Sequence, residues 1–314
     1  MTLYAAIDEF IEDRLTFCTS KTVSNYRNTL RYFSDFVCSC SGSGSVDLES
    51  LRSEDIRKYI IYLRSKEKLS NHPFKPTIKG CITDTSVRTY LIDIRAFFNY
   101  HVRAGNLSSS PFNGIRLLRR DKKVIIPISQ ADVEKIEIYF KSVYGYYSYR
   151  NPLILHFFLD SGIRLHELIN LKWSDINTEN NYIIIYGGKG RKDRFIPLCS
   201  RLRKLFLEFK NLYRKRSGEY VFSFQHKQIT EYSIKMIFQR IRENCCIDTF
   251  YPHLCRHTFA TSFIMAGGDI SILAIYMGHE SISTTQNYLH IANFCKLTGF
   301  DIYKIDKSLV KPFY

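Results

Sequence analysis

The sequence has no run of about eighteen apolar residues, the length that spans a bilayer. Its start, MTLYAAIDEF, also lacks the basic residues and apolar stretch of a secretory signal. None of its nine cysteines forms a C-x-x-C pair of the kind that binds zinc. We therefore expect a cytoplasmic protein with reduced thiols, no structural zinc ribbon and no membrane partner.

Acidic residues are scarce compared with basic ones. The 314 residues include 30 Asp and Glu against 45 Lys and Arg, which gives a net charge of +15. Such an excess usually indicates a polyanionic partner, most often nucleic acid, although solubilising charge is the alternative. Charge alone does not distinguish a protein that acts on nucleic acid from one that only binds it.

Hydrophobic periodicity predicts a helical N-terminal part. Ser20 is a candidate N-cap for the second helix, whose apolar residues recur every three or four positions from Val23 to Val37. Glycine and serine predict a loop over 38–45, and prolines predict another over 67–80. The predicted helices cover 4–17, a segment from residue 20, 53–66 and 86–104. Three basic residues lie off the apolar stripe of the second helix and are candidates for DNA contact: Lys21, Arg27 and Arg31.

A basic, weakly patterned stretch follows the fourth helix and predicts a linker over 116–126. A cationic linker can lie along phosphates, whereas a solvated helix end is the alternative. We therefore predict two domains, 1–115 and 127–314. The basic residues of this linker that are candidates for DNA contact are Arg119, Arg120, Lys122 and Lys123.

The C-terminal part mixes helices with a small β element. Ser129 is a candidate N-cap, and 151–171 predicts a buried helix, a break at Gly162 and a second helix. YIIIYGG and RFIPL predict a hairpin around KGRKD, and the chain from about 200 to 300 is mainly helical by periodicity. The expected fold class is mainly α, of the α+β type, with a small sheet in the C-terminal domain.

Four segments of this half carry polar residues that a packed core does not require: SGIRLHEL, GGKGRKDR, PHLCRHTFAT and MGHESISTTQNYLH. Each has a plain structural interpretation when taken alone. Arg164 and Glu167 are spaced as a surface ion pair, a basic hairpin tip bearing Lys189 is often solvated, and a helical Tyr288 is usually core.

The third segment also raises the question of a metal site. His253 and His257 share a helix face, as two zinc ligands often do. However, the zinc-protease pattern requires Glu where Leu254 stands, and the cation Arg256 lies on the face that a metal would occupy. A two-metal site would need converging carboxylates, and nothing groups Asp160, Glu167 and Asp175.

In order and spacing, these segments together resemble the tyrosine recombinase family. The likeness is closest to its short two-domain bacterial members, such as the Xer recombinases and mobile-element integrases. It covers about residues 126–290 strongly and 4–112 only by helical pattern. HLCRH then resembles the His-x-x-Arg box of a phosphate-binding active site, which needs no metal.

The resemblance implies the role of each matched residue. Tyr288 would be the nucleophile that forms a 3′-phosphotyrosyl ester, and Arg164 and Arg256 would hold the non-bridging oxygens. His253 and His279 would donate hydrogen bonds to the phosphate, Lys189 would protonate the leaving 5′ oxygen, and Glu167 would support the site. No cofactor and no metal are implied. At the hairpin tip, Arg191 and Lys192 are candidates for DNA contact.

The resemblance also implies partners and a reaction. A helical, SAM-like core-binding domain over 1–115 would clamp double-stranded DNA recombination sites together with the catalytic domain. Strand exchange through a Holliday junction implies a homo-tetramer on DNA, in which the C-terminal tail packs on its own domain or is exchanged between subunits. The sequence does not show whether accessory proteins are required. We favour integration or excision of a mobile element, with chromosome-dimer resolution, DNA inversion or a silent DNA-binding module as alternatives.

Overall fold

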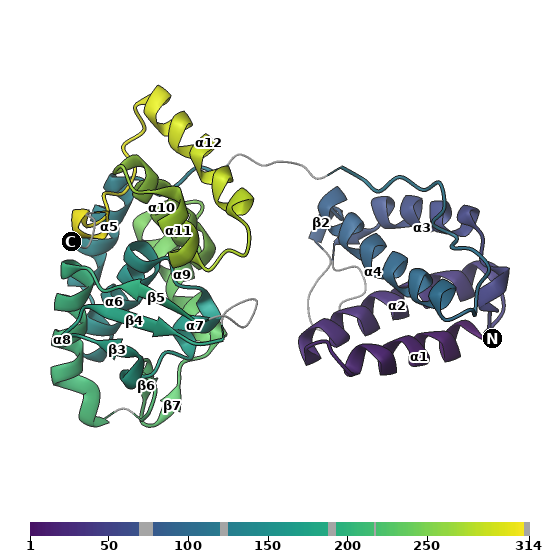
Figure 1. Ribbon diagram of the computed structural model, residues 1–314, viewed down its shortest axis with the longest axis horizontal. Coiled ribbons are helices and arrows are strands. Elements are labelled where there is room, and N and C mark those ends of the chain that lie inside the picture. The colour runs from purple at the N-terminus through teal and green to yellow at the C-terminus, as the bar shows by residue number, and fades with distance from the viewer. Residues whose placement is uncertain (69–77, 120–124, 188–192, 217, 311–314) are drawn as a thin grey trace. The chain divides into compact units, whose positions relative to one another are not determined.

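The computed structural model describes residues 1–68, 78–119, 125–187, 193–216 and 218–310 (Figure 1). The chain forms two compact units, Met1–Lys123 and Val124–Tyr314. The break between them falls within the segment predicted as a linker. Within the described residues, no helix combines the length and the apolar character needed to cross a bilayer.

In its described residues the N-terminal unit is a bundle of four α-helices, as predicted: α1 (Leu3–Leu15), α2 (Ser20–Ser41), α3 (Ser53–Ser65) and α4 (Asp84–Arg103). Its core is aromatic. The rings of Phe10 and Phe97 meet edge to face at 5.6 Å, and those of Phe33 and Phe98 at 6.0 Å. Edge-to-face pairs of this kind add to the free energy gained by burial alone. The periodicity found in the sequence thus marks the buried faces of these helices.

Three local expectations for this unit are wrong. The N-cap of α2 is Thr19, whose hydroxyl accepts the N–H of Thr22 at 3.3 Å, and not Ser20. The segment predicted as a loop from residue 38 continues α2 to Ser41, because serine hydroxyls bond to carbonyls of the preceding turn and Gly42 ends the helix at φ +65°. The predicted loop over 67–80 contains paired strands, β1 (Glu67–Lys68) and β2 (Ile78–Cys81), and residues 69–77 lie outside the described residues.

The C-terminal unit is mainly helical with a small antiparallel sheet, so the predicted fold class is confirmed. The sheet has the order β3-β4-β5, and Ile183 of β4 pairs with Ile196 of β5. Short 3₁₀ turns occur in this unit at Trp173–Asp175, Arg214–Arg216 and Lys307–Leu309, and in the N-terminal unit at Leu48–Ser50. The strands are β3 (Ile176–Asn177), β4 (Tyr182–Ile185), β5 (Arg194–Pro197) and the unpredicted pair β6 (Ser223–Phe224) and β7 (Lys227–Gln228). The helices are α5 (Gln130–Lys141), α6 (Tyr146–Ser161), α7 (Leu165–Ile169), α8 (Ser200–Tyr213), α9 (Glu231–Cys245), α10 (Pro252–Met265), α11 (Ile270–Met277) and α12 (Ile282–Thr298).

Two helices run through the centre of this unit. Every residue of α6 from Leu153 to Ser161 is buried, and α10 is buried from Leu254 to Phe263 except at His257. These helices are largely apolar on all sides and therefore lie in the core, and the polar side chains within these spans, His257 excepted, are buried with them. Figure 1 shows α10, α11 and α12 grouped at one end of the unit, with the β3–β5 sheet and α7 beside them. This end brings together the termini of several helices.

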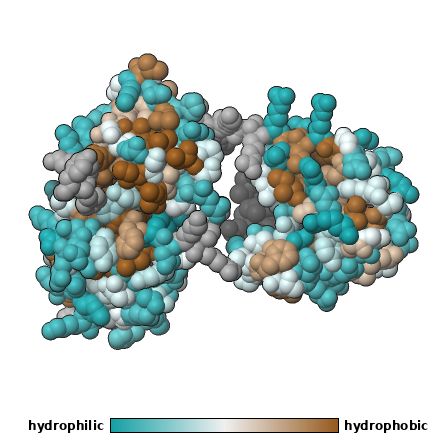
Figure 2. Space-filling view, viewed as in Figure 1, coloured by the Kyte–Doolittle hydropathy of each residue, from teal (hydrophilic) through white to brown (hydrophobic). Residues whose placement is uncertain are grey.

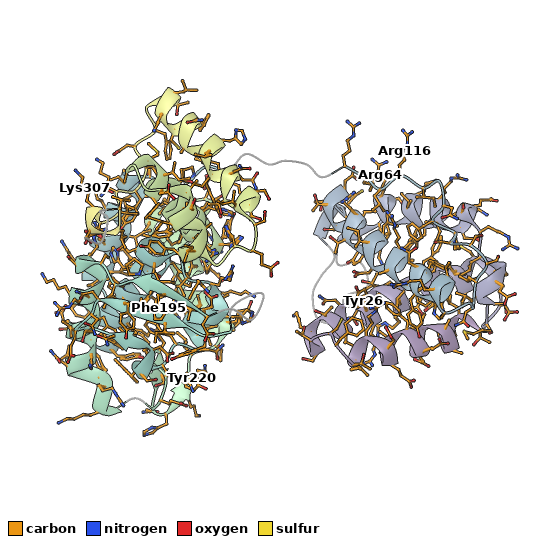
Figure 3. All side chains as sticks on the ribbon, in the orientation of Figure 1. Tyr26, Arg64, Arg116, Phe195, Tyr220 and Lys307 are labelled. Atoms are coloured by element: carbon orange, nitrogen blue, oxygen red, sulfur yellow. The ribbon has the colours of Figure 1, made fainter. Side chains whose placement is uncertain are left out.

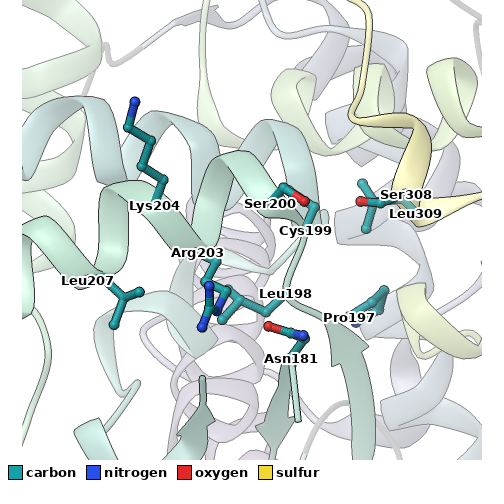
Figure 4. A pocket seen from close by; sticks show the side chains of 10 residues that line it. All are labelled: Asn181, Pro197, Leu198, Cys199, Ser200, Arg203, Lys204, Leu207, Ser308 and Leu309. Carbon is teal, nitrogen blue, oxygen red and sulfur yellow. The ribbon is translucent and has the colours of Figure 1, made fainter. Parts of the chain in front are cut away.

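The C-terminal tail folds back on its own unit. Tyr303 is 1% exposed, and its hydroxyl donates to the buried carboxylate of Asp160 at 2.8 Å. Farther on, Ser308 and Leu309 line a pocket of about 440 Å³ at the start of α8, beside Cys199 and Ser200 (Figure 4). The remaining residues that line this pocket are Asn181, Pro197, Leu198, Arg203, Lys204 and Leu207.

Gly162 ends α6 in the left-handed conformation, with φ +60°. A side-chain carbon at this position would lie 2.5 Å from Cδ1 of Phe259 in α10. Two features therefore require a glycine here, the left-handed backbone angle and the close approach of the Phe259 ring. It lets the chain turn directly from a buried helix to Arg164.

Gly162→Ala is expected to lower the free energy of unfolding of this unit by about 2–4 kcal/mol, from left-handed strain plus overpacking. Gly299→Ala is the matched control, because Gly299 also ends a helix at φ +66° but has nothing within 4 Å of an added carbon. The control should lose only about 1–2 kcal/mol. Urea unfolding of both variants measures the difference, and equal losses would contradict the packing argument.

Candidate active site

Arg256 projects from α10 and lies almost completely buried, at 2% exposure. Its guanidinium donates to the carbonyl of Gly162 and, at 2.5 Å, to the carbonyl of Met277. These carbonyls belong to the C-terminal ends of α6 and α11, where helices leave acceptors without partners and carry partial negative charge. Arg256 therefore ties two helix ends together and is held in one orientation by them.

Arg164 lies at the N-cap of α7, and its side chain reaches the C-terminal end of α11. Its backbone N–H donates to Oε2 of Glu167 at 2.8 Å, and its Nη1 donates to Oε1 at 2.9 Å. Its Nη2 donates to the carbonyl of Gly278 at 2.9 Å. Glu167 is only 10% exposed, so the pair is not the solvated surface ion pair that its spacing alone allowed.

Arg194, the first residue of β5, was not predicted as a site residue. It donates to both carboxylate oxygens of Glu167, at 2.9 and 2.7 Å, and its Nε donates to the carbonyl of Tyr276 at 2.9 Å. The next residue, Phe195, faces outward at 59% exposure, so Arg194 and Ile196 turn inward (Figure 3). The sequence contained a signal for this burial. Side chains two residues apart in a strand lie on the same face, so Arg194 shares the buried face of Ile196.

Glu167 is the point where these arginines meet. Burial alone would raise its pKa, but the hydrogen bonds and charges of Arg194 and then Arg164 outweigh burial and lower the pKa to about 2. The carboxylate is therefore fully ionised at neutral pH and acts as a fixed acceptor for both guanidinium groups.

The cluster carries an excess of positive charge. Arg164 and Arg194 both pair with the single carboxylate of Glu167, and Arg256 forms no ion pair among the described residues, which leaves two positive charges uncompensated. Burial and the charge of Arg164 lower the pKa of Arg256, yet a guanidinium keeps its proton at neutral pH. Uncompensated buried cations with fixed geometry form a site for an anion with several oxygens.

Aromatic rings surround this cationic centre. Tyr288 of α12 is 5% exposed, and its ring lies nearly parallel to that of His279, at 6.3 Å and 7°. The ring of His257 lies 5.5 Å from Tyr288 and 4.6 Å from His253. Nδ1 of His279 is 2.8 Å from the hydroxyl of Thr285, and its Nε2 is 3.5 Å from Arg256.

The electrostatic environment fixes how these rings are protonated. Burial and then the charges of Arg256 and Arg164 lower the pKa of His253. Burial, His253 and Arg256 lower the pKa of His257 to about 4, so both imidazoles are neutral at pH 7. Burial raises the pKa of Tyr288, while Arg256 and Arg164 act to lower it. In the free protein the phenol is therefore protonated beside neutral imidazoles that can accept a proton.

His257 is the second residue whose place at this site the sequence left open. It was considered only as a zinc ligand with His253. The described residues contain no group of three His, Cys, Asp or Glu side chains able to hold a metal ion. The ring of His257 instead contacts Tyr288, and its buried Nδ1 makes no hydrogen bond with the described part of the chain.

Several predicted residues cannot be placed in this geometry. The hairpin is confirmed at its base, where Ile185 pairs with Arg194 and Asp193 accepts the N–H of Gly187 at 2.9 Å. Its tip, with Lys189, Arg191 and Lys192, lies outside the described residues, as do Arg120, Lys122 and Lys123 of the predicted linker. In the N-terminal unit the predicted DNA contacts are exposed: Lys21, Arg27, Arg31 and Arg119. Figure 3 shows Arg64 and Arg116 on the surface of the same unit.

The chain matches two known protein families. Residues 121–293 match the phage integrase family, and residues 2–122 match the phage integrase SAM-like domain. The chain belongs to the phage integrase family. Its predicted identity as a tyrosine recombinase or integrase is thereby confirmed.

Relatives of known name agree with this assignment. The tyrosine recombinase XerC of Staphylococcus aureus (strain bovine RF122 / ET3-1) is 28% identical over 279 residues, which cover 87% of this chain and 86% of the relative. Among solved structures, the Tn1549 transposon integrase in complex with transposon right end DNA has a TM-score of 0.73 at 19% identity, over 95% of this chain and 99% of that one. A lambda integrase dimer bound to a COC′ core site has a TM-score of 0.69 at 16% identity, over 92% and 95%. At these identities the structures show a shared fold.

Proposed function

We propose that this phage integrase family member is a site-specific recombinase that cleaves and rejoins DNA strands through a 3′-phosphotyrosyl intermediate. One observation carries the proposal: a buried guanidinium cluster with uncompensated positive charge lies beside the phenol of Tyr288. Such a cluster stabilises the charge that builds on a phosphate during transfer. The phenol of Tyr288 lies close enough for Arg256 and Arg164 to act on its pKa, and it is the proposed nucleophile.

In the proposed cleavage step, the oxygen of Tyr288 attacks the scissile phosphorus. The Tyr288 oxygen–phosphorus bond forms as the bond between phosphorus and the 5′ oxygen breaks. His253, neutral at pH 7, takes the phenolic proton, and Lys189 donates a proton to the departing 5′ oxygen. The reverse sequence, with a 5′ hydroxyl attacking the phosphotyrosyl ester, joins the strand without consuming a nucleotide.

The remaining groups hold the phosphate. Arg256 and Arg164 would bind its non-bridging oxygens, because each has a guanidinium fork fixed by backbone carbonyls. His279, held by Thr285, would donate to the same oxygens. Glu167 would act indirectly, by fixing Arg164.

Double-stranded DNA is the proposed partner. The net charge of +15 and the exposed basic residues of α2 support this, as do the DNA-bound states of the integrases that share the fold. We propose that the helical unit and the catalytic unit both contact the duplex. The helical unit is the proposed core-binding domain.

Strand exchange between two sites would require four subunits. The end of the C-terminal unit formed by α11 and α12 supports contact between copies, because it exposes Ile275 at 62%, Phe294 at 42% and Leu297 at 88%. Figure 2 shows apolar residues gathered there. Exchange of the C-terminal tail between subunits remains part of this proposal, although Tyr303 packs the tail on its own unit here.

Two biological roles use this chemistry. We favour integration or excision of a mobile element, on the insertion-like segment 67–80 and the fold shared with a transposon integrase. Resolution of chromosome dimers is the second candidate, favoured by the likeness to XerC over 87% of the chain.

The test is covalent capture in the absence of metal. Wild-type protein is incubated in EDTA with a pool of nicked duplexes sheared from genomic DNA of its source. Covalent complexes are precipitated with detergent and potassium, and their DNA ends are sequenced. We expect recovery of one defined junction with protein attached to a 3′ phosphate.

The sequenced junctions also separate the two roles. A junction bordering a mobile segment supports integration or excision, and a single site in the chromosome supports dimer resolution. Retention of DNA in gel shifts without any covalent product, with or without magnesium and a second site, would instead identify a silent DNA-binding module.

A further inference from the structure

Arg194 is fully engaged inside the protein. Its Nε, Nη1 and Nη2 each donate a hydrogen bond, and the side chain is 5% exposed. Arg164, which is proposed to bind substrate, is more accessible, with a side chain that is 25% exposed. We therefore expect Arg194 to act on the reaction through another residue.

The partner of Arg194 is the carboxylate that aims Arg164. Arg194 grips both oxygens of Glu167, and Arg164 donates to those same oxygens through its side chain and backbone. The carboxylate is thus shared by Arg194 and Arg164. A bidentate guanidinium–carboxylate pair fixes the plane of the carboxylate as well as its position.

Arg194 also supports the other anchor of Arg164. Its Nε bonds to the carbonyl of Tyr276, two residues before Gly278, whose carbonyl accepts Nη2 of Arg164. Gly278 has φ +59°, and a side-chain carbon there would lie 3.0 Å from Cδ of Arg194. The turn that leads to His279 is therefore shaped around the Arg194 side chain.

We propose that Arg194 is a positioning residue for strand cleavage, which fixes the Glu167 carboxylate and the Gly278 turn so that both hold Arg164 on the scissile phosphate. The inference rests on the proposed function. Arg194 differs from the phosphate-binding arginines because its effect on the reaction passes entirely through Glu167 and Gly278.

Loss of Arg194 should change how the cleavage rate depends on pH. Burial raises the pKa of Glu167, and Arg194 is the group that most strongly opposes this. Without Arg194, Glu167 takes up a proton at higher pH and no longer holds Arg164 as a carboxylate. Because the ionised form is the active form, the defect must grow as the pH falls.

The experiment measures single-turnover cleavage of the nicked duplex recovered by covalent capture, from pH 5.5 to 8.5. Arg194→Gln is expected to cleave about 10- to 100-fold more slowly than wild type, the usual effect of a residue that supports a ligand-binding group. The ratio to wild type should be larger at pH 5.5 than at pH 8.5, and DNA affinity in gel shifts should be unchanged.

Two further variants separate positioning from folding. Arg201→Gln removes an arginine that contacts another buried carboxylate of the same unit, Asp160, outside this cluster. It should lower thermal stability without a pH-dependent cleavage defect. If Arg194→Gln is unfolded at the assay temperature, Arg194→Met serves instead, because it also removes the positive charge beside Glu167 while its apolar chain keeps part of the packing.

Glu167→Gln completes the test. Added to Arg194→Gln, it should remove the pH-dependent part of the defect, because no carboxylate remains to titrate. A defect that is equal at all pH values, or that Arg201→Gln reproduces, would make Arg194 merely structural. A wild-type protein that forms no covalent complex would overturn the proposed function itself, and this inference with it.

Discussion

Tyr288→Phe is expected to abolish covalent attachment to DNA while leaving DNA binding unchanged. The substitution removes a single oxygen atom. The remaining ring keeps its contacts with His257 and His279, and the hydroxyl makes no hydrogen bond with the described residues that would be lost. Without the nucleophile no phosphotyrosyl ester forms, so the covalent band on a denaturing gel should fall below detection.

Tyr276→Phe provides the matched control for this result. Tyr276 belongs to the same unit, packs against Phe263, and contributes only its backbone carbonyl to the candidate site. This variant should form the covalent complex at the wild-type rate. Residual attachment in Tyr288→Phe would place the nucleophile elsewhere, and loss of DNA binding would show that the hydroxyl supports the fold.

The elements were predictable where the sequence pattern is local. The apolar stripe from Val23 to Val37 predicts α2, and the N-cap Ser129 accepts the N–H of Asp132 as expected. The paired segments YIIIYGG and RFIPL become β4 and β5, which pair at their base as the predicted hairpin. In each case the decisive information lies within a few residues of the element itself.

The errors come from contacts that local pattern does not contain. The serine-rich end of α2 stays helical because Val37 is buried against the core and the hydroxyls bond to preceding carbonyls. The N-cap of α2 was misassigned for a related reason, since Thr19 and Ser20 are both good caps and the side-chain contact selects Thr19.

The residues of the candidate site also differ in how well the sequence predicts them. Residues that touch substrate in the proposal, such as Arg256 and Tyr288, stand in recognisable boxes. Arg194 also stands in one of these segments, but its pairing with Glu167 could not be read from the sequence, because it depends on where β5 lies against α7 and α11. The sequence therefore predicts the groups of the proposed chemistry better than the residues that position them.

Arg256→Lys is expected to slow single-turnover cleavage by about 100- to 1,000-fold, the usual effect of removing one preorganised donor from a charged transition state. The substitution keeps the positive charge but replaces a fork of donors with a single ammonium group. Arg256 donates to the carbonyls of Gly162 and Met277 with two different nitrogens. One ammonium group cannot hold both carbonyls and still reach a phosphate.

The same substitution should lower the free energy of unfolding by about 1–3 kcal/mol, because one buried carbonyl loses its partner. Arg203→Lys is the matched control, since Arg203 is exposed on α8 and bonds only to the carbonyl of Thr178 among the described contacts. It should change neither cleavage nor stability. Cleavage by Arg256→Lys within a few fold of wild type would mean that charge alone suffices. In that case the fixed geometry of the cluster, on which the proposed mechanism depends, would not be what binds the phosphate.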